Sequence, residues 1–141
     1  MLVFIRGLRA KGKSDMGYTY PLLTRSADES IILADDTFDL GANECIMVDV
    51  GLVLDIGEDG CEIGIELINL KLLLGGGALD GTVWLDRRVD FSYDDESDSF
   101  YLRLSPVRRS VDQRTVNGFA ILDIGRSLKG FKYLYNSRPG S

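Results

Sequence analysis

The pattern with the most recognisable chemistry lies near the amino terminus, where residues 7–14 are Gly-Leu-Arg-Ala-Lys-Gly-Lys-Ser. They form an intact G-x-x-x-x-G-K-[ST] pattern, in which backbone N–H groups, Gly12, Lys13 and Ser14 would hold phosphates and Mg²⁺. Such a loop must open a helix, but residues 17–21 contain glycine, threonine and proline, which are poor helix formers. Nor does a series of alternating strands and helices follow to build a parallel sheet. A phosphate site at Gly12, Lys13 and Ser14 is therefore an alternative to the leading interpretation.

A cluster of carboxylates offers a second kind of chemistry, the binding of a hard cation. Its members are Asp94, Asp95, Glu96 and Asp98. A calcium loop starting at the first of them would need glycine at its sixth position and glutamate at its twelfth, where the chain has Ser99 and Ser105. The pattern fails, so we interpret the cluster as a solvated turn between strands at residues 89–93 and 99–104, and predict no metal site.

Two further aspartates, Asp55 and Asp123, occupy the same place in a repeated Leu-Asp-Ile-Gly string. A pair of carboxylates can divide acid and base work if the fold brings them within reach of one substrate. Nothing in their spacing requires this, and we expect each to face outward or to cap a turn.

Histidine is absent from all 141 residues. The chain therefore lacks imidazole-activated nucleophiles, histidine metal sites and a group that titrates near neutral pH. Cys45 and Cys61 lie 16 residues apart with no C-x-x-C motif, which is the spacing of neither a zinc site nor a redox pair. We expect both thiols to be small buried side chains in a reducing compartment, and we predict no cofactor. A non-catalytic protein is favoured over an enzyme.

The charge is unevenly distributed along the chain. Residues 26–102 carry a net charge of −16, whereas residues 1–25 carry +4 and residues 103–141 carry +6. Solvated faces of different sign would explain this, and so would recognition between the acidic middle and the basic ends, within one chain or between two copies. Nucleic-acid binding through Arg108 and Arg109 is unlikely for a chain with a pI near 4.6, since the acidic middle repels phosphate.

Apolar residues alternate with polar ones over most of the chain, which is typical of strands with one buried face. The clearest runs are residues 51–56, 62–67 and 99–104, and Asp-rich or Gly-rich breaks separate them as hairpin turns would. At residues 66–74 the leucines also fit helical spacing, so we predict one short helix there. The chain is expected to be mainly β and antiparallel.

The Leu-Asp-Ile-Gly string, each time followed by a glycine and a further alternating run, indicates an internal repeat. We place two related copies at about residues 26–70 and 89–135, within a single domain covering residues 1–141. A glycine-rich stretch at residues 75–81 is expected to be a flexible linker between them. The predicted fold is two related antiparallel β units, packed as a sandwich or a partly open barrel.

The second copy resembles a known family. Tyr93-Asp94, the segment Asp98-Ser99-Phe100-Tyr101-Leu102-Arg103-Leu104, the strand at residues 116–123 and Gly130-Phe131 are similar to the small prokaryotic family called domain of unknown function 2283. Residues 51–68 resemble the closing half of the family's pattern. The resemblance implies a compact β-rich unit in a prokaryotic cytoplasm, with no agreed activity and no catalytic residues to transfer. It also suggests a role beside a partner protein, such as an antitoxin has.

These observations favour a non-catalytic β-rich module that acts by binding and forms homo-oligomers through sheet edges or faces. The candidate interface residues are Tyr101, Arg103, Lys132, Tyr133 and Tyr135. The alternatives are a small-molecule or nucleotide site in the residue 7–14 loop or in an acidic pocket, and an antitoxin-like or nucleic-acid-binding protein. The opening apolar run, residues 1–5, is too short for a signal peptide, so we expect a cytoplasmic protein with no membrane association.

Overall fold

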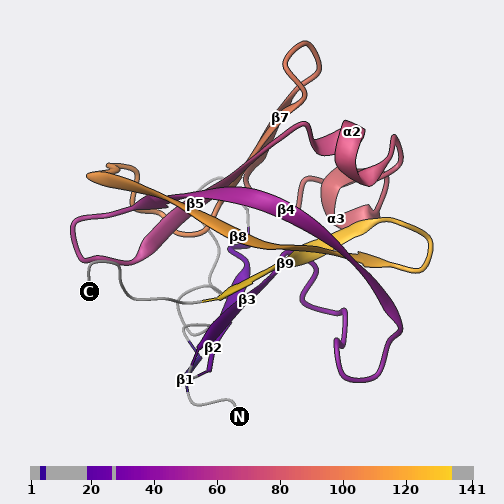
Figure 1. Cartoon of the computed structure of the whole chain (residues 1–141), viewed down its shortest axis with the longest axis horizontal. Coiled ribbons are helices and arrows are strands. Elements are labelled where there is room, and N and C mark those ends of the chain that lie inside the picture. Colours follow the sequence, from indigo (N-terminus) through magenta and orange to yellow (C-terminus); the bar gives the residue numbers. More distant parts are fainter. Residues whose placement is uncertain (1–3, 6–18, 27, 135–141) are drawn as a thin grey trace.

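A computed structural model describes residues 4–5, 19–26 and 28–134. The chain forms one antiparallel sheet that curls into a half-barrel, with two short helices on it (Figure 1). The mainly β prediction is confirmed, and of the two packings considered the partly open barrel is the one observed. A sandwich would need a second sheet facing the first, and the described strands all belong to one sheet. In this part of the chain, no helix is long and apolar enough to cross a bilayer.

The described strands are β1 (Phe4–Ile5), β2 (Leu22–Arg25), β3 (Glu29–Leu33), β4 (Cys45–Ile56), β5 (Glu62–Ile68), β6 (Phe91–Asp94), β7 (Ser99–Arg103), β8 (Asp112–Asp123) and β9 (Leu128–Leu134). The helices are α2 (Leu70–Leu74) and α3 (Thr82–Leu85). The order across the sheet is β1-β2-β3-β9-β8-β4-β5-β7-β6. The long strands β4 and β8 form its centre and pair over their whole length, from Cys45 opposite Asp123 to Ile56 opposite Asp112.

Alternation along β4 shows why these residues form a strand with one buried face. Val50, Leu52, Leu54 and Ile56 are buried, whereas Gly51 between them is exposed. Successive side chains of a strand point to opposite faces, so one face of β4 supplies the core and the other meets solvent. The same period places residues from β5, β7, β8 and β9 in a single core.

Hairpins from the two halves of the chain are interleaved in the sheet. The hairpin β4–β5 lies between β8 and β7, so β3 pairs with β9, β4 with β8, and β5 with β7. Neither half forms a continuous sheet by itself. The strands β2 to β5 contain 4, 5, 12 and 7 residues, and β6 to β9 contain the same numbers in the same order. These lengths are consistent with the repeat at residues 26–70 and 89–135, which stays a prediction.

The segment between the halves is packed rather than loose. The short helix expected at residues 66–74 begins only at Leu70, because residues 66–68 still pair with β7. Ala78, in the middle of the glycine-rich stretch 75–81, is fully buried, and its carbonyl accepts a hydrogen bond from the N–H of Leu128. A second helix, α3, follows and buries Trp84. The composition suggested a flexible linker, but the structure uses this stretch to cover the core.

Gly130 provides a test of how closely β3 and β9 approach. A Cβ atom at Gly130 would overlap the carbonyl oxygen of Ile32, which is backbone and has little freedom to move. We expect Gly130→Ala to lower the free energy of unfolding by about 1–3 kcal/mol. Gly51 is the matched control, since a Cβ there meets nothing within 4 Å. Gly51→Ala should be neutral or stabilise by up to about 1 kcal/mol. Urea unfolding measures both, and equal effects would contradict the close approach.

Candidate functional site

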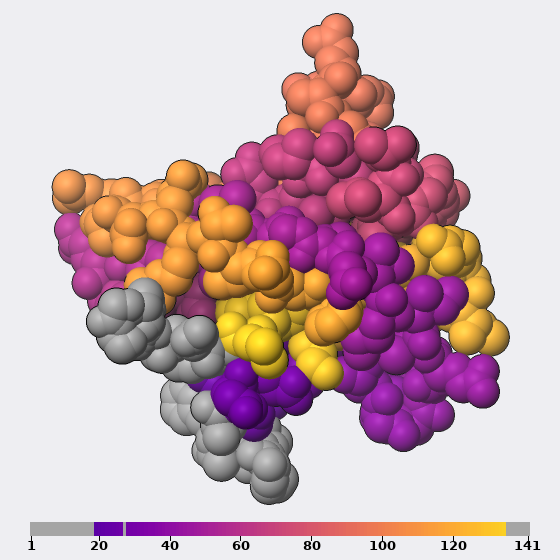
Figure 2. All heavy atoms as spheres, viewed as in Figure 1, coloured from indigo at the N-terminus to yellow at the C-terminus, as the bar shows by residue number. Residues whose placement is uncertain are grey.

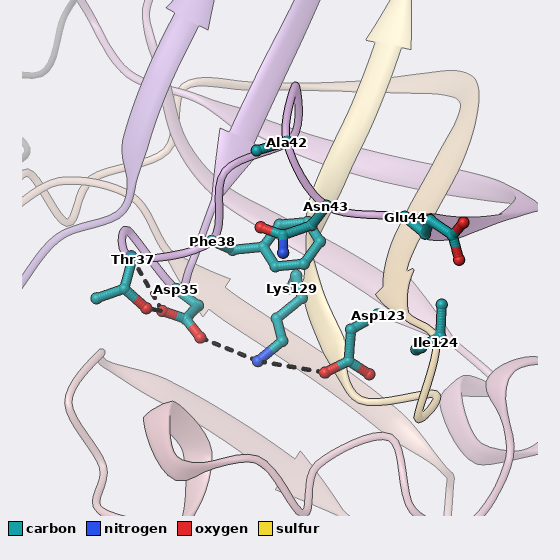
Figure 3. Close-up of a pocket in the computed structure, with 9 residues that line it drawn as sticks. All are labelled: Asp35, Thr37, Phe38, Ala42, Asn43, Glu44, Asp123, Ile124 and Lys129. Atoms are coloured by element: carbon teal, nitrogen blue, oxygen red, sulfur yellow. Dashed lines mark hydrogen bonds and ion pairs between the residues drawn. The ribbon is translucent and has the colours of Figure 1, made fainter.

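An acidic hollow lies at one end of the central strands (Figure 3). The loop joining β3 to β4 forms one side, and the end of β8 and the start of β9 form the other. The hollow measures about 480 Å³. Its lining residues are Asp35, Thr37, Phe38, Ala42, Asn43, Glu44, Asp123, Ile124 and Lys129. Three carboxylates against one ammonium give this lining a net negative charge, which would favour a cationic ligand.

Lys129 holds the hollow together. Its Nζ atom lies 3.0 Å from a carboxylate oxygen of Asp35 and 3.7 Å from one of Asp123 (Figure 3). Burial would raise the pKa of Asp35, but hydrogen bonds from Thr37 and Lys129 outweigh it and lower this pKa. The carboxylate is therefore charged at neutral pH and ties the loop to β9. Among the described residues, no group of three potential ligands is placed to hold a metal ion.

Three tyrosines each donate a hydrogen bond to a carboxylate, an arrangement that resembles an acid–base pair. Tyr93 bonds to Asp98 at 2.5 Å, Tyr133 to Glu62 at 2.7 Å and Tyr101 to Asp55 at 3.0 Å. Burial and then the Glu62 carboxylate raise the pKa of Tyr133 well above its usual value. The Asp98 hydrogen bond raises the pKa of Tyr93 to about 12. Such hydroxyls keep their protons at neutral pH, so they serve as donors and not as bases or nucleophiles.

Asp98 shows what the acidic cluster at residues 94–98 does. Its carboxylate accepts hydrogen bonds from the backbone N–H groups of Lys71 and Leu72, in the first turn of α2. Burial acts to raise the pKa of Asp98, but these bonds and the Tyr93 hydroxyl outweigh it and lower the pKa. Residues 95–98 form the turn between β6 and β7, as expected. Asp98 thus fastens the hairpin of one half to the helix of the other.

Asp55 and Asp123 do not form a catalytic pair. Asp123 lies opposite Cys45, and Asp55 is ten residues further along β4, which places the two carboxylates roughly 33 Å apart. Asp55 accepts hydrogen bonds from Tyr101 and Gln113, whereas Asp123 accepts one from the N–H of Ser127 in the β8–β9 turn. The two copies of the string therefore occupy different positions, one within a strand and the other at a strand end.

The predicted interface residues are scattered over the molecule. Tyr101 is half-buried, with its ring over Gly64, and Arg103 lies beside it with its Nε 3.7 Å from Asp90. Lys132 pairs with Glu29 at 3.3 Å. Tyr133 is only 1% exposed, which removes it from any interface. Tyr135 lies outside the described residues, as do Gly12, Lys13 and Ser14.

Basic residues of the chain's end meet the acidic middle within one molecule. The ion pairs that join them are Lys129–Asp35, Lys132–Glu29, Arg103–Asp90, Arg108–Asp90 and Arg109–Glu58, and Arg25 pairs with Glu62. Complementarity of charge, which the sequence assigned to one chain or to two copies, thus acts at least within one chain. Cys45 and Cys61 are free thiols, but both are partly exposed and not buried as expected, because each lies at an end of a long strand.

Comparison with protein-family models, curated proteins and solved structures finds no match. The resemblance to domain of unknown function 2283 therefore stays a prediction.

An exposed apolar face was missed by the sequence reasoning. Leu72, Leu73 and Leu85, on the outward sides of α2 and α3, are 77%, 41% and 67% exposed. The helices are neighbours at the β8–β9 turn, since Arg126 donates to the carbonyl of Leu74 and the Trp84 indole N–H donates to that of Leu128. A warning was present in residues 70–74, Leu-Lys-Leu-Leu-Leu, because a helix of five residues cannot bury four leucines on one face.

Alkaline titration tests the setting of Tyr101. Burial, followed by the hydrogen bond to Asp55, raises its pKa to about 12, while an unfolded tyrosine ionises near 10. Between these values the unfolded chain loses the proton and the folded chain keeps it, so stability present below pH 10 declines up to about pH 12. With allowance for solvent screening, we expect Tyr101→Phe to avoid about 1 kcal/mol of this loss. Urea unfolding at about pH 8 and 11.5 checks it, and an equal loss in variant and wild type would contradict it.

Proposed function

We propose that this protein is a non-catalytic binding module that self-associates through the outward face of α2 and α3, which we call the leucine face (Leu72, Leu73 and Leu85). The observation that carries the proposal is the exposure of three large apolar side chains on two adjacent helices. Isolated exposed apolar residues are normal, but a group of them supports a protein interface.

Charges around the leucine face support contact between two copies. Arg87 and Arg88 follow α3, and the β6–β7 hairpin, which projects beyond the helices (Figures 1 and 2), carries Asp94, Asp95 and Glu96 at its tip. In a two-fold interface the same surface of both copies meets itself, so the acidic tip of one copy can approach the arginines of the other. Such rim charges orient an apolar interface more than they strengthen it.

Light scattering coupled to size-exclusion chromatography tests the proposal at micromolar concentration. We expect a mass of about twice 15.6 kDa for the wild type, and the monomer mass for the double variant Leu72→Gln and Leu85→Gln. Val111→Gln, at a residue 50% exposed elsewhere, is the matched control and should keep the dimer. About 1 M salt should leave the dimer intact, since apolar contact is not screened. A monomeric wild type, or identical masses for all three proteins, would refute the proposal.

The acidic hollow favours a second candidate function, small-molecule binding. A ligand at one hundred times its dissociation constant stabilises the folded state by about 2.7 kcal/mol. A thermal-shift panel of ATP, GTP, Mg²⁺, Ca²⁺ and a small organic amine would detect it, with Asp123→Asn as the variant that weakens the response. No shift with any compound in the panel would remove this candidate.

A further inference from the structure

A groove lies beside the acidic hollow, on the other side of Thr37 and Phe38. Its floor is the outer face of the β2–β3 hairpin, where the register sets Leu22 opposite Leu33 and Thr24 opposite Ile31. These four side chains face away from the core, because the alternate residues Leu23 and Ile32 are buried in it. Residues 36–41 of the β3–β4 loop form the opposite wall. The groove measures about 580 Å³ and is open along its length.

Chemically, the groove combines an apolar floor with an acidic rim. Leu22, Ile31, Leu33, Phe38 and Leu40 supply the apolar surface. Asp36 and Asp39, both exposed, lie at the rim, and no basic residue lines the groove. Residues 34–44 contain four carboxylates and no basic residue. An occupant must therefore offer apolar side chains and positive charge together.

The loop that walls the groove is held in place before any partner arrives. Asp39 accepts a hydrogen bond from the N–H of Gly41 and donates its own N–H to the side chain of Asn43. Asp35 accepts from Thr37 and forms the ion pair with Lys129. A preformed wall avoids the free-energy cost of ordering a loop upon binding.

We propose that this groove binds a basic amphipathic peptide segment of a partner protein, with its apolar side chains on the β2–β3 floor and its Lys or Arg side chains at Asp36 and Asp39. An elongated groove with an apolar floor suits the apolar face of a peptide. The acidic rim repels nucleic-acid phosphates and anionic lipid headgroups, so it selects against both. This site is distinct from the leucine face, and a dimer would leave the proposal unchanged.

Fluorescence anisotropy with the full chain tests the proposal. The probe is a fluorescein-labelled peptide of alternating leucine and lysine, and the same peptide with glutamate for lysine is its control. At about 50 mM salt we expect saturable binding of the lysine peptide only, weakened at least tenfold at about 500 mM salt, where screening shortens the range of charge interactions.

Two neutralising variants locate the binding site. The double variant Asp36→Asn and Asp39→Asn keeps a side-chain oxygen at both positions and should weaken binding about tenfold. The matched control, Asp95→Asn with Glu96→Gln, removes the same net charge at the β6–β7 tip and should bind as the wild type does. Leu33→Gln should weaken binding at both salt concentrations, and circular dichroism confirms that each variant is folded. Failure of the lysine peptide to bind, equal binding of the glutamate peptide, or equal losses in the two double variants would overturn the proposal.

Discussion

Replacing Glu62 with alanine is expected to lower the free energy of unfolding by about 3–5 kcal/mol, because it removes one partner of a buried ion pair. The carboxylate of Glu62, on β5, lies 2.5 Å from the guanidinium of Arg25, on β2, and their side chains are only 5% and 11% exposed. It also accepts the buried hydroxyl of Tyr133, on β9. The variant would leave a guanidinium and a hydroxyl in the interior without this carboxylate.

The size of the effect reflects the place of the pair in the sheet. Four strands, β3, β9, β8 and β4, separate β2 from β5 in the sheet order. The Arg25–Glu62 pair therefore spans the concave side of the half-barrel and does not link neighbouring strands. Loss of the pair should loosen the curl of the sheet as well as remove a contact.

Glu29→Ala is the matched control for Glu62→Ala. Glu29 pairs with Lys132 at 3.3 Å, but both side chains are about one-third exposed. Exposed pairs contribute about 0–1 kcal/mol, so this variant should hardly change stability. Tyr133→Phe should fall between the two, at about 1–2 kcal/mol. Urea unfolding followed by the fluorescence of the single tryptophan measures all three, and an equal cost for the two glutamates would contradict the spanning role of Glu62.

The strands were predictable because alternation is a local property of the sequence. Residues 51–56, 62–67 and 99–104 alternate, and the structure places strands there. The same rule, applied to Phe131, Lys132 and Tyr133, would have placed Tyr133 on the core face with Phe131. Its assignment to an interface was wrong because its polar hydroxyl was taken as a sign of exposure, and Glu62 satisfies that hydroxyl inside the protein.

Strand neighbours were not predictable in the same way. Alternation fixes which face of a strand is buried, but it does not say which strand lies alongside, so the interleaving of the two halves could not be derived. The acidic hollow depends on the meeting of Asp35 and Lys129, which are 94 residues apart. The groove depends on the shape of the β3–β4 loop, whose acidic composition was visible but whose packing was not.

Trp84→Ala is expected to cost about 3–5 kcal/mol, because the segment between the two halves completes the core rather than merely joining them. Trp84 is 2% exposed, and its indole N–H donates to the carbonyl of Leu128 at 3.0 Å. Its ring packs edge-on against Phe91 and Phe100, with centroids 5.0 and 5.5 Å away. A single side chain therefore contacts β6, β7 and β9, three strands that the interleaved order distributes across the sheet.

Two other variants separate the contributions of Trp84. Trp84→Phe keeps an aromatic ring but loses the N–H donor, so it should cost less than Trp84→Ala and more than Thr82→Ala. Thr82, exposed on the same helix, serves as the control, and its replacement should change stability by no more than about 0.5 kcal/mol. Circular dichroism during urea unfolding is the measurement, since two of these proteins lack the tryptophan. If Trp84→Ala cost no more than Thr82→Ala, residues 75–85 would be the flexible joint that their glycines suggest, and the half-barrel would be held together by its strands alone.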